Sequence, residues 1–258
     1  MFYKAFGYFL ILSLFSGLFA SDEIAQKCLL QSYPHTIKAL ENHQVIFYNQ
    51  KIYPWRIHSE MTDYQILLNA PDFASSFNYP YPLDSFNKYF YEDSSRIRDT
   101  RLFKAVYGDS KQAVEKNLKE FVWVDGNIFS FNIQNGAYEA LLRVINKLQN
   151  LPQDMQVYLQ NIGGTYKWRN IAGSSQLSPH SFGIALDINV AHSSYWLWDK
   201  QSKREQTNKQ ANSIPQAIVE IFESEGFIWG GRWWHYDTMH FEYRPEILCY
   251  ALEEHKNK

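Results

Sequence analysis

The chain has 258 residues, of which 45% are hydrophobic and 17% aromatic, and it carries a formal net charge of −2. This length and apolar content suit one globular domain with an added N-terminal region. The near-balanced charge argues against a nucleic-acid-binding protein, which would usually show a concentrated basic face. The many aromatic residues suit a dense core, or a groove that binds peptide or sugar, and composition does not separate the two.

The first twenty residues differ from the rest of the chain. Lys4 is their only charge, and the stretch from Phe6 to Ala20 is almost wholly apolar. This is shorter than the ~20 apolar residues of a membrane span and is typical of a secretory signal peptide, here residues 1–20. Leu18 is larger than the small residue expected at that place, so an uncleaved anchor is the alternative. We expect an exported protein of the periplasm or cell envelope, with no membrane span once the signal is removed.

Helix and strand signals follow one another along the remaining chain without a regular repeat. In chain order the patterns predict a hairpin over 44–55 around Asn49-Gln50, an irregular stretch over 56–100, a helix over 109–121, a second hairpin over 120–132 around Asp125-Gly126, a helix over 137–148, a strand over 184–190, a helix over 214–225 and a last strand over 240–243. This order predicts an α+β fold, with a mainly antiparallel sheet and flanking helices. No GxGxxG fingerprint and no P-loop occur, so nucleotide chemistry has no support.

Cys28 and Cys249 are the only two cysteines. Neither has a CxxC partner, which excludes a cysteine zinc site. In an oxidising compartment they could pair and clamp the two ends of the mature chain. The alternative is two separate buried thiols, and nothing in the sequence fixes the distance between them.

Residues 178–187 (SPHSFGIALD) carry the strongest chemical signal. His180 and Asp187 are seven residues apart, and Gly183 between them lets the chain turn back. On the strand that follows, the Ile and Leu residues face a core, while Asp187 lies on the opposite face beside the small Ala185. Burying a carboxylate without a partner is costly, so a cation or a hydrogen-bond donor is expected beside it.

Residues 235–240 (HYDTMH) form the second chemical group. Two histidines and one carboxylate leave a fourth position on a zinc ion for water, which hydrolysis requires. Zinc lowers the pKa of that water toward ~7 and polarises the scissile carbonyl. A further carboxylate must take the proton and pass it to the leaving amine, and Asp237, close in sequence to His240, is the candidate. The alternative for each of these residues is a structural role, as an ordinary buried histidine or an ion-paired aspartate.

The order Ser-x-His-x-x-Gly-x-Ala-x-Asp, followed by His-x-Asp-x-x-His-Phe-Glu, resembles the VanY-like zinc D-alanyl-D-alanine carboxypeptidase family. That family includes D-Ala-D-Ala dipeptidases and phage L-alanyl-D-glutamate endopeptidases. The likeness is specific in residues 161–189 and 226–246 and covers most of 116–250. It implies a hedgehog-like DD-peptidase core as the catalytic domain over 116–258. We expect residues 21–115 to pack on this core, because their hairpins and aromatic residues would not be stable alone, and a wall-facing or partner-facing addition is the alternative.

The resemblance also implies a role for each matching residue. His180, Asp187 and His240 match the three zinc ligands, so Zn²⁺ is the implied cofactor. Asp237 matches the general base, and His235 matches a histidine that assists the transition state in some relatives.

Arg169 matches an arginine that stabilises the oxyanion or orients the substrate carboxylate, a task that suits a fork-shaped permanent cation. Its alternative is a surface or ion-pairing arginine. Ser178 is a candidate donor to substrate, or equally a turn cap. Four further aromatic residues are expected as pocket wall or core: Trp229, Trp233, Trp234 and Phe241.

The implied function is hydrolysis of a peptide bond in the peptidoglycan stem peptide, first as a D-alanyl-D-alanine carboxypeptidase. The alternative bond is that between L-Ala and D-Glu, cut by an endopeptidase. A non-catalytic cell-wall-binding module on the same fold is a further reading, but binding alone needs no base such as Asp237. A serine or cysteine nucleophile has no GxSxG motif to support it. The expected partner is the stem peptide, bound by a monomer, with no nucleic acid.

Overall fold

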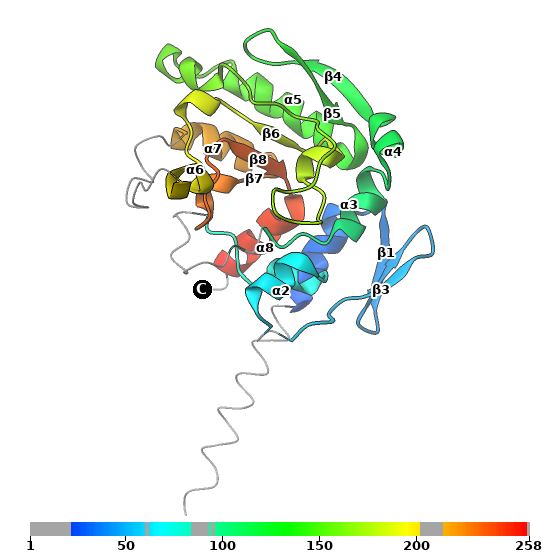
Figure 1. The fold of residues 1–258 in the computed structure, drawn as a ribbon. Coiled ribbons are helices and arrows are strands. Elements are labelled where there is room, and N and C mark those ends of the chain that lie inside the picture. Colours follow the sequence, from blue (N-terminus) through cyan, green and yellow to red (C-terminus); the bar gives the residue numbers. More distant parts are fainter. Residues whose placement is uncertain (1–21, 60–61, 84–92, 94–95, 202–213, 257–258) are drawn as a thin grey trace, which may run out of the picture.

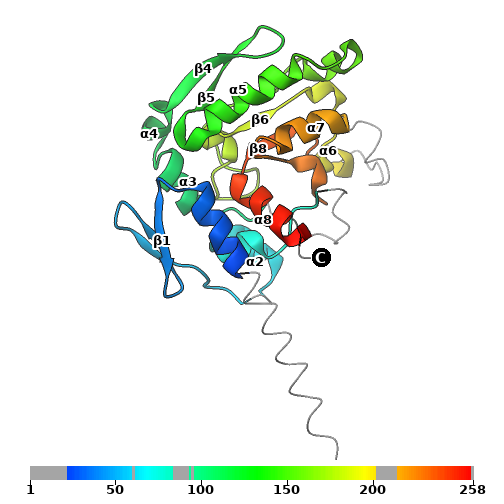
Figure 2. The ribbon, with the colours of Figure 1, turned by 180° about the vertical axis from the view of Figure 1, so that it is seen from behind.

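The predicted mixture of helices and antiparallel strands is observed, and the fold class is α+β. The computed structural model describes residues 22–59, 62–83, 93, 96–201 and 214–256. Figure 1 and Figure 2 show the ribbon from opposite sides. The predicted signal peptide at residues 1–20 lies outside the described residues. None of the helices in the described part of the chain combines the length and the apolar character that a bilayer crossing requires.

The described elements are short and lie in mixed order along the chain. After a helix over residues 22–32, the α-helices are α2 (Tyr64–Asn69), α3 (Thr100–Tyr107), α4 (Lys111–Glu115), α5 (Ala137–Leu148), α6 (Trp196–Gln201), α7 (Gln216–Glu223) and α8 (Pro245–Lys256). The strands are β1 (Ile37–Glu41), β2 (Gln44–Phe47), β3 (Ile52–Pro54), β4 (Leu118–Val122), β5 (Ile128–Asn132), β6 (Ala185–Asp187), β7 (Phe227–Trp229) and β8 (His240–Tyr243). They form three small antiparallel sheets within the described residues.

The first sheet confirms the predicted hairpin over 44–55 and extends it by one strand. β2 and β3 pair as expected, and Gln50 takes a positive φ of 68° in the turn between them. β1, which the sequence patterns did not predict, pairs with the other edge of β2. The turn between β1 and β2 places both Asn42 and His43 at positive φ. Such a turn favours Asn and Gly, so a histidine there gives little hairpin signal.

Two predictions between residues 56 and 121 were wrong. The stretch 56–100 was expected to be irregular, but α2 lies within it and α3 begins at its end. Asp99 caps α3, because its carboxylate accepts from the main-chain N–H of Arg101 at 2.9 Å. The single helix expected over 109–121 is only α4, and Leu118–Val122 forms strand β4 instead. Pairing with β5 along five residues decides the conformation of that stretch.

The second hairpin and the long helix were predicted correctly. β4 and β5 pair from Leu118 opposite Asn132 to Val122 opposite Ile128. Gly126 has a φ of 87° in their turn, a conformation that favours glycine. α5 covers the predicted residues 137–148, and α7 covers the middle of the predicted 214–225. Pro215 stands just before the first residue of α7, where a missing N–H costs nothing.

The third sheet has the strand order β6-β8-β7 and carries the chemically interesting residues. β8 has the predicted bounds, but β6 ends at Asp187, short of the predicted Val190. The cause is Asn189, whose φ of 44° turns the chain out of the strand. On the core face of the sheet, Phe241 stacks on Phe222 of α7 with 4.0 Å between ring centroids. The opposite face of β8 holds His240 and Glu242.

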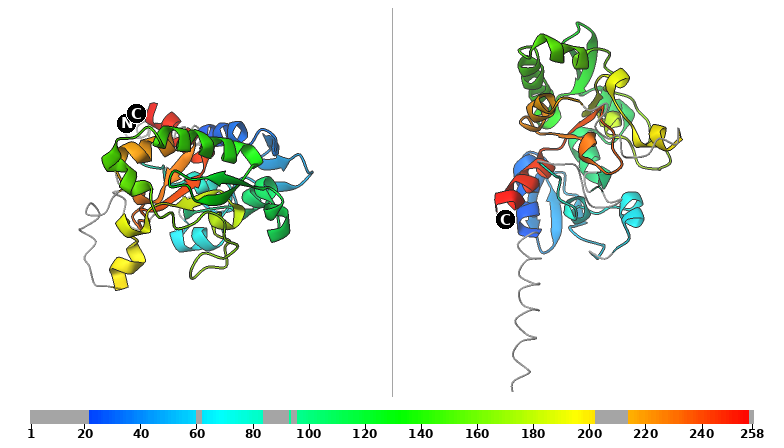
Figure 3. Two further views of the ribbon diagram at one scale, coloured as in Figure 1. Left: turned by 90° about the horizontal axis from the view of Figure 1, so that it is seen from above. Right: turned by 90° about the vertical axis from the view of Figure 1, so that its left-hand side faces the viewer.

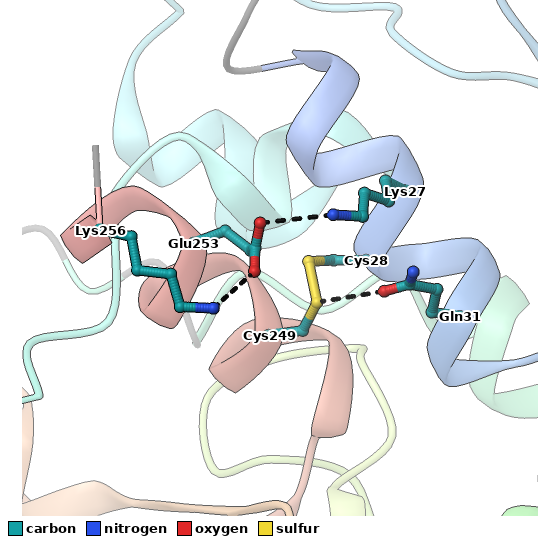
Figure 4. The surroundings of a disulfide bond; sticks show 6 residues. All are labelled: Lys27, Cys28, Gln31, Cys249, Glu253 and Lys256. Carbon is teal, nitrogen blue, oxygen red and sulfur yellow. Dashed lines mark hydrogen bonds and ion pairs between the residues drawn. A yellow bond between two sulfur atoms is a disulfide. The ribbon is translucent and has the colours of Figure 1, made fainter.

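Helix α8 follows β8 and was not predicted, although a proline at its first position is a common helix start. Figure 2 shows α8 beside the helix over 22–32. Cys28 and Cys249 join these two helices through a disulfide, with 5.5 Å between the Cα atoms. Figure 4 shows this bond and the neighbouring Lys27–Glu253 ion pair. Of the two possibilities that the sequence left open, the structure has the disulfide.

Loss of this disulfide is expected to lower the free energy of unfolding by about 2–4 kcal/mol, because the cross-link restricts the unfolded chain. The variant with both Cys28→Ala and Cys249→Ala tests this by urea unfolding. Wild type unfolded in the presence of a reductant is the matched control, and its unfolding midpoint should fall at the same urea concentration as that of the variant. An unchanged midpoint in both would contradict the expectation.

Residues from before and after position 116 share one hydrophobic cluster. The Phe103 ring of α3 meets Phe182 with 5.4 Å between centroids, and Phe77 meets Tyr250 of α8 at 5.2 Å. In the right-hand view of Figure 3, the blue and cyan N-terminal elements lie with α8 at one end, and the green α5 and β4–β5 hairpin lie at the other. The third sheet lies between these ends.

Candidate metal centre and catalytic pocket

His180 lies in a single 3-10 turn, Pro179–Phe182, directly before β6. The Ser178 hydroxyl caps this turn by accepting from the main-chain N–H of His180 at 3.4 Å. Gly183 ends the turn at a φ of 65°, and an added Cβ would stand 2.6 Å from Leu118 Cδ2. This glycine therefore provides the predicted reversal of the chain, and Ser178 has the capping role that was one of its two readings.

Asp187 is the last residue of β6 and pairs directly with His240, the first residue of β8. A loop lies along its other side, where Gly163 N donates to Asp187 O at 2.6 Å and Asp187 N donates to Gly164 O at 3.0 Å. A Cβ on Gly163 would stand 2.8 Å from Val190 Cγ2, so only glycine allows this approach. Main-chain bonds on both sides therefore fix the backbone that carries Asp187.

The structure brings the three predicted ligands together. His180 Nε2 lies 3.3 Å from Asp187 Oδ1, and His240 Nδ1 lies 3.0 Å from the same oxygen. One ligand atom from each of the three residues lies within 4.8 Å of the others. Within the described ranges, this is the one group of histidine and carboxylate side chains that meets the geometry of a metal site.

Hydrogen bonds behind the two rings determine which nitrogen faces the centre. His180 Nδ1 lies 2.7 Å from the main-chain oxygen of Thr165, so this nitrogen carries the proton and donates. His240 Nε2 lies 3.2 Å from Glu242 Oε2 and donates in the same way. When a ring is in its neutral form, the nitrogen that it turns toward Asp187 Oδ1 carries no proton. Two lone pairs and a carboxylate oxygen repel one another unless a cation or a proton stands between them.

The pKa values of Asp187 and His240 agree with a positive charge held between these side chains. Burial raises the pKa of Asp187, but the neighbouring His180 and His240 lower it well below its usual range. Burial lowers the pKa of His240, yet hydrogen bonds to Asp187 and Glu242 raise it to about 9. Without a metal, therefore, a proton is held where a metal would bind.

The donor set fits zinc. Two imidazoles and one carboxylate are the ligands of catalytic zinc sites that keep one open position. Bonds of about 2.0–2.1 Å in tetrahedral geometry place ligand atoms about 3.3 Å apart, close to the 3.0 Å and 3.3 Å observed around Asp187.

A pocket of about 590 Å³, its open mouth included, opens over this centre. All the residues to which the sequence assigned chemistry line it: Arg169, Ser178, His180, Asp187, His235, Asp237 and His240. Trp233 forms part of the wall, whereas Trp229 and Phe241 lie in the core and Trp234 is half-buried beside the pocket. The predicted site residues thus share one cavity, and their chemical roles remain predictions.

Asp237 lies in the turn before β8. Its main-chain N–H donates to Gly230 O at 3.0 Å, and a Cβ on Gly230 would stand 2.5 Å from Asp237 O. Oδ1 of Asp237 is buried and has no hydrogen-bond partner among the described residues. Burial, opposed by His240 and assisted by Asp187, raises the pKa of Asp237 to about 6. Such a carboxyl group accepts a proton more readily than an exposed one.

His235 and Arg169 also line the pocket. The His235 ring packs edge-on against Trp196 with 4.7 Å between centroids, and its Nδ1 lies 2.8 Å from Asp93 Oδ2. Arg169 is exposed, and its Nη1 donates over a long distance, 3.4 Å, to the main-chain oxygen of Asn170. Its guanidinium is therefore available to a ligand in the pocket.

Sequence reasoning missed several residues of this site. Glu242 stands two positions after His240 on one strand, so alternation along β8 could have placed it on the same face. Asp93 and Arg98 gave no local signal, because they meet their partners 142 and 144 residues away. Other residues that line the pocket were not predicted as part of the site: Arg96, Ile171, Ala172, Pro179, Tyr195 and Trp196.

Comparison with known families gives one match. Residues 172–243 match the model of a family described as D-alanyl-D-alanine carboxypeptidase. This confirms the resemblance drawn from the motifs. The matched segment contains His180, Asp187, His235, Asp237 and His240 but begins after Arg169. Comparisons with curated proteins and with solved structures give no match.

Proposed function

We propose that this chain, a peptidase of the D-alanyl-D-alanine carboxypeptidase family by its residues 172–243, is a zinc enzyme that hydrolyses a peptide bond in the peptidoglycan stem peptide. The observation that carries the proposal is the convergence of His180 Nε2 and His240 Nδ1 on Asp187 Oδ1, at 3.3 Å and 3.0 Å. The buried carboxyl group of Asp237 lines the same pocket. A protein that only bound the cell wall could have such a metal site, but it would not need the buried carboxyl group of Asp237.

His180 Nε2, His240 Nδ1 and a carboxylate oxygen of Asp187 would hold the metal. When bound, zinc polarises a carbonyl group and lowers the pKa of water. Thr165 and Glu242 keep the two rings oriented, because each accepts the proton of the nitrogen that faces away.

Asp237 would move the proton. With a pKa of about 6 it is mostly ionised at neutral pH, yet basic enough to accept a proton from the attacking water. The same carboxyl group can then pass this proton to the leaving amine. Its unpartnered Oδ1 is the atom proposed for this transfer.

Arg169, His235 and Ser178 would act on the substrate. The exposed guanidinium of Arg169 can pair with a substrate carboxylate or with the negative charge that develops on the carbonyl oxygen. His235, between Trp196 and the pocket, would assist the same charge. The Ser178 hydroxyl oxygen accepts from the main-chain N–H of His180, and its hydrogen can still donate to substrate.

Arg169 favours carboxypeptidase action over the endopeptidase alternative. Arg96 and Arg98 also line the pocket but pair with the carboxylates of Asp93 and Glu242, whereas the Arg169 guanidinium is exposed. A peptide that ends in a free carboxylate suits this guanidinium.

We further propose that residues 21–115 pack on the catalytic domain over 116–258 as part of one unit, exported by means of residues 1–20. The Cys28–Cys249 disulfide and the shared hydrophobic cluster support the packing. The wall substrate, which lies outside the cytoplasm, supports export.

The test is mass spectrometry of purified muropeptides before and after treatment with the protein. Loss of one terminal alanine is expected, abolished by a chelator and restored by zinc. Cleavage between L-Ala and D-Glu would instead assign the endopeptidase activity. Intact muropeptides in the presence of zinc, with the protein bound to cell walls, would refute the enzyme and support the binding module.

A further inference from the structure

Asp93 connects the N-terminal region to the catalytic pocket. Its side chain is buried, with 1% exposure for the residue. Oδ1 accepts from the main-chain N–H of Trp234 at 2.6 Å. Oδ2 accepts from the main-chain N–H of His235 at 3.1 Å and from the Nδ1 of its ring at 2.8 Å. The carboxylate therefore holds both the backbone and the imidazole of a pocket residue.

A small second core anchors Asp93 itself. Its main-chain N–H donates to the Tyr64 hydroxyl at 2.8 Å, and this hydroxyl donates to the main-chain oxygen of Asp93 at 2.9 Å. Tyr64 begins α2 and is buried with Leu67 and Ile97 in a hydrophobic cluster separate from the main one. Tyr64 thus holds the main chain of Asp93, while Trp234 and His235 hold its carboxylate.

The bond to Nδ1 determines what the His235 ring can do. Because Nδ1 donates to Asp93, a hydrogen bond from this ring to a substrate would come from Nε2. Trp196 packs against the ring and limits its rotation. Arg96 Nη1 lies 3.7 Å from Asp93 Oδ2, so the carboxylate stays charged while it faces the imidazole.

We propose that Asp93 is the positioning residue of His235, fixing its ring so that Nε2 faces the negative charge that develops on the substrate carbonyl oxygen. This inference rests on the proposed function. Asp93 acts through the imidazole, because its carboxylate accepts the Nδ1 proton and sets the orientation of the ring. The alternative is that Asp93 only ties down the loop at Trp234 and His235.

Asp72 offers a matched control for that alternative. It is also fully buried and also accepts from two successive main-chain N–H groups, those of Ile57 at 2.6 Å and His58 at 2.8 Å. It does not line the pocket. Asp72→Asn therefore removes a buried loop-holding carboxylate of the same kind away from the site.

The kinetic test compares four variants on a stem peptide that ends in D-Ala-D-Ala: Asp93→Asn, His235→Ala, the double variant and Asp72→Asn. Asp93→Asn should lower kcat about 10- to 100-fold with little change in KM and with full zinc content. In the double variant the loss should equal that of His235→Ala alone, because Asp93 then has no ring to act on. The proposal would be overturned if the kcat loss of the double variant were the product of the two single losses. It would also be overturned if Asp72→Asn lowered kcat as much as Asp93→Asn does.

Nitrogen NMR of the histidine rings provides a readout without turnover. A hydrogen-bonded Nδ1–H signal of His235 should be present in wild type and absent from both Asp93→Asn and His235→Ala. If wild type is inactive but shows this signal, the proposed function fails and the positioning contact stands. If wild type is active and the signal is missing, only the role of Asp93 fails.

Discussion

Asp237→Asn is expected to retain its zinc and to lose turnover by about 10²-fold or more. The amide has nearly the shape of the carboxyl group but cannot take a proton from water at neutral pH. Because Asp237 Oδ1 has no hydrogen-bond partner among the described residues, the exchange breaks no side-chain contact of that atom. The measurement pairs kcat on a stem peptide with the zinc content of the purified protein.

His180→Ala and His240→Ala are the contrasting variants. Each removes an imidazole nitrogen from the group around Asp187, so both zinc and activity should be lost together. Full zinc content and full activity in His240→Ala would contradict the ligand assignment. Loss of zinc in Asp237→Asn would make Asp237 a ligand instead of the base.

Glu242→Ala is expected to lower the free energy of unfolding by about 3–5 kcal/mol, because it leaves the buried Arg98 without its carboxylate and removes one of the two carboxylates that Arg244 contacts, the other being Glu246. Arg98 forms a fork on Glu242, from Nε to Oε1 at 2.8 Å and from Nη2 to Oε2 at 2.7 Å. Arg244 Nη1 reaches Oε1 at 3.0 Å, and His240 donates to Oε2. All four side chains are buried. Urea unfolding of the metal-free proteins measures the difference.

The pH dependence of this loss has a definite sign. Burial raises the pKa of Glu242, but Arg98, His240 and Arg244 together lower it well below its usual value. A depressed pKa contributes stability that is complete above the unfolded-state pKa and is lost as the pH falls through the folded-state value. The difference in free energy of unfolding between wild type and Glu242→Ala should therefore become smaller as the pH is lowered.

Glu115→Ala is the matched control for Glu242→Ala. Glu115 pairs with Lys111 at 3.8 Å on the surface, with 43% of its side chain exposed. Its loss should cost at most about 1 kcal/mol. Equal effects of the two substitutions would contradict the buried-network account. Zinc affinity gives an additional readout, because removal of the partner behind a ligand histidine typically weakens binding 10- to 100-fold.

The sequence predicted the part of the site whose pattern is local. His180, Gly183 and Asp187 lie within one turn and one strand, so their spacing alone indicates a shared location. His240 was predicted to begin a strand, and that strand has the predicted bounds. Alternation along this strand would have placed Glu242 on the same face as His240.

Long-range contacts explain what the sequence did not predict. Arg98 and Asp93 come from a stretch that was expected to be irregular. Folding brings Arg98 against Glu242 of β8 and Asp93 against His235 in the turn before β8, and no local pattern indicates these contacts. Strand β4 was mistaken for helix because its conformation depends on its partner β5. Local pattern thus brings out the candidate ligands and the alternating strands, whereas the residues that support them from behind are brought there by tertiary packing.

The disulfide has one more consequence, which concerns cleavage of the main chain. Cys28 and Cys249 are 221 positions apart, so the covalent structure between them is a closed ring. His180, Asp187, Asp237 and His240 all belong to that ring. A single protease cut in any surface loop of the ring opens it without separating the fragments. Both halves of the candidate site then stay tethered at high effective concentration, and re-association remains an intramolecular event.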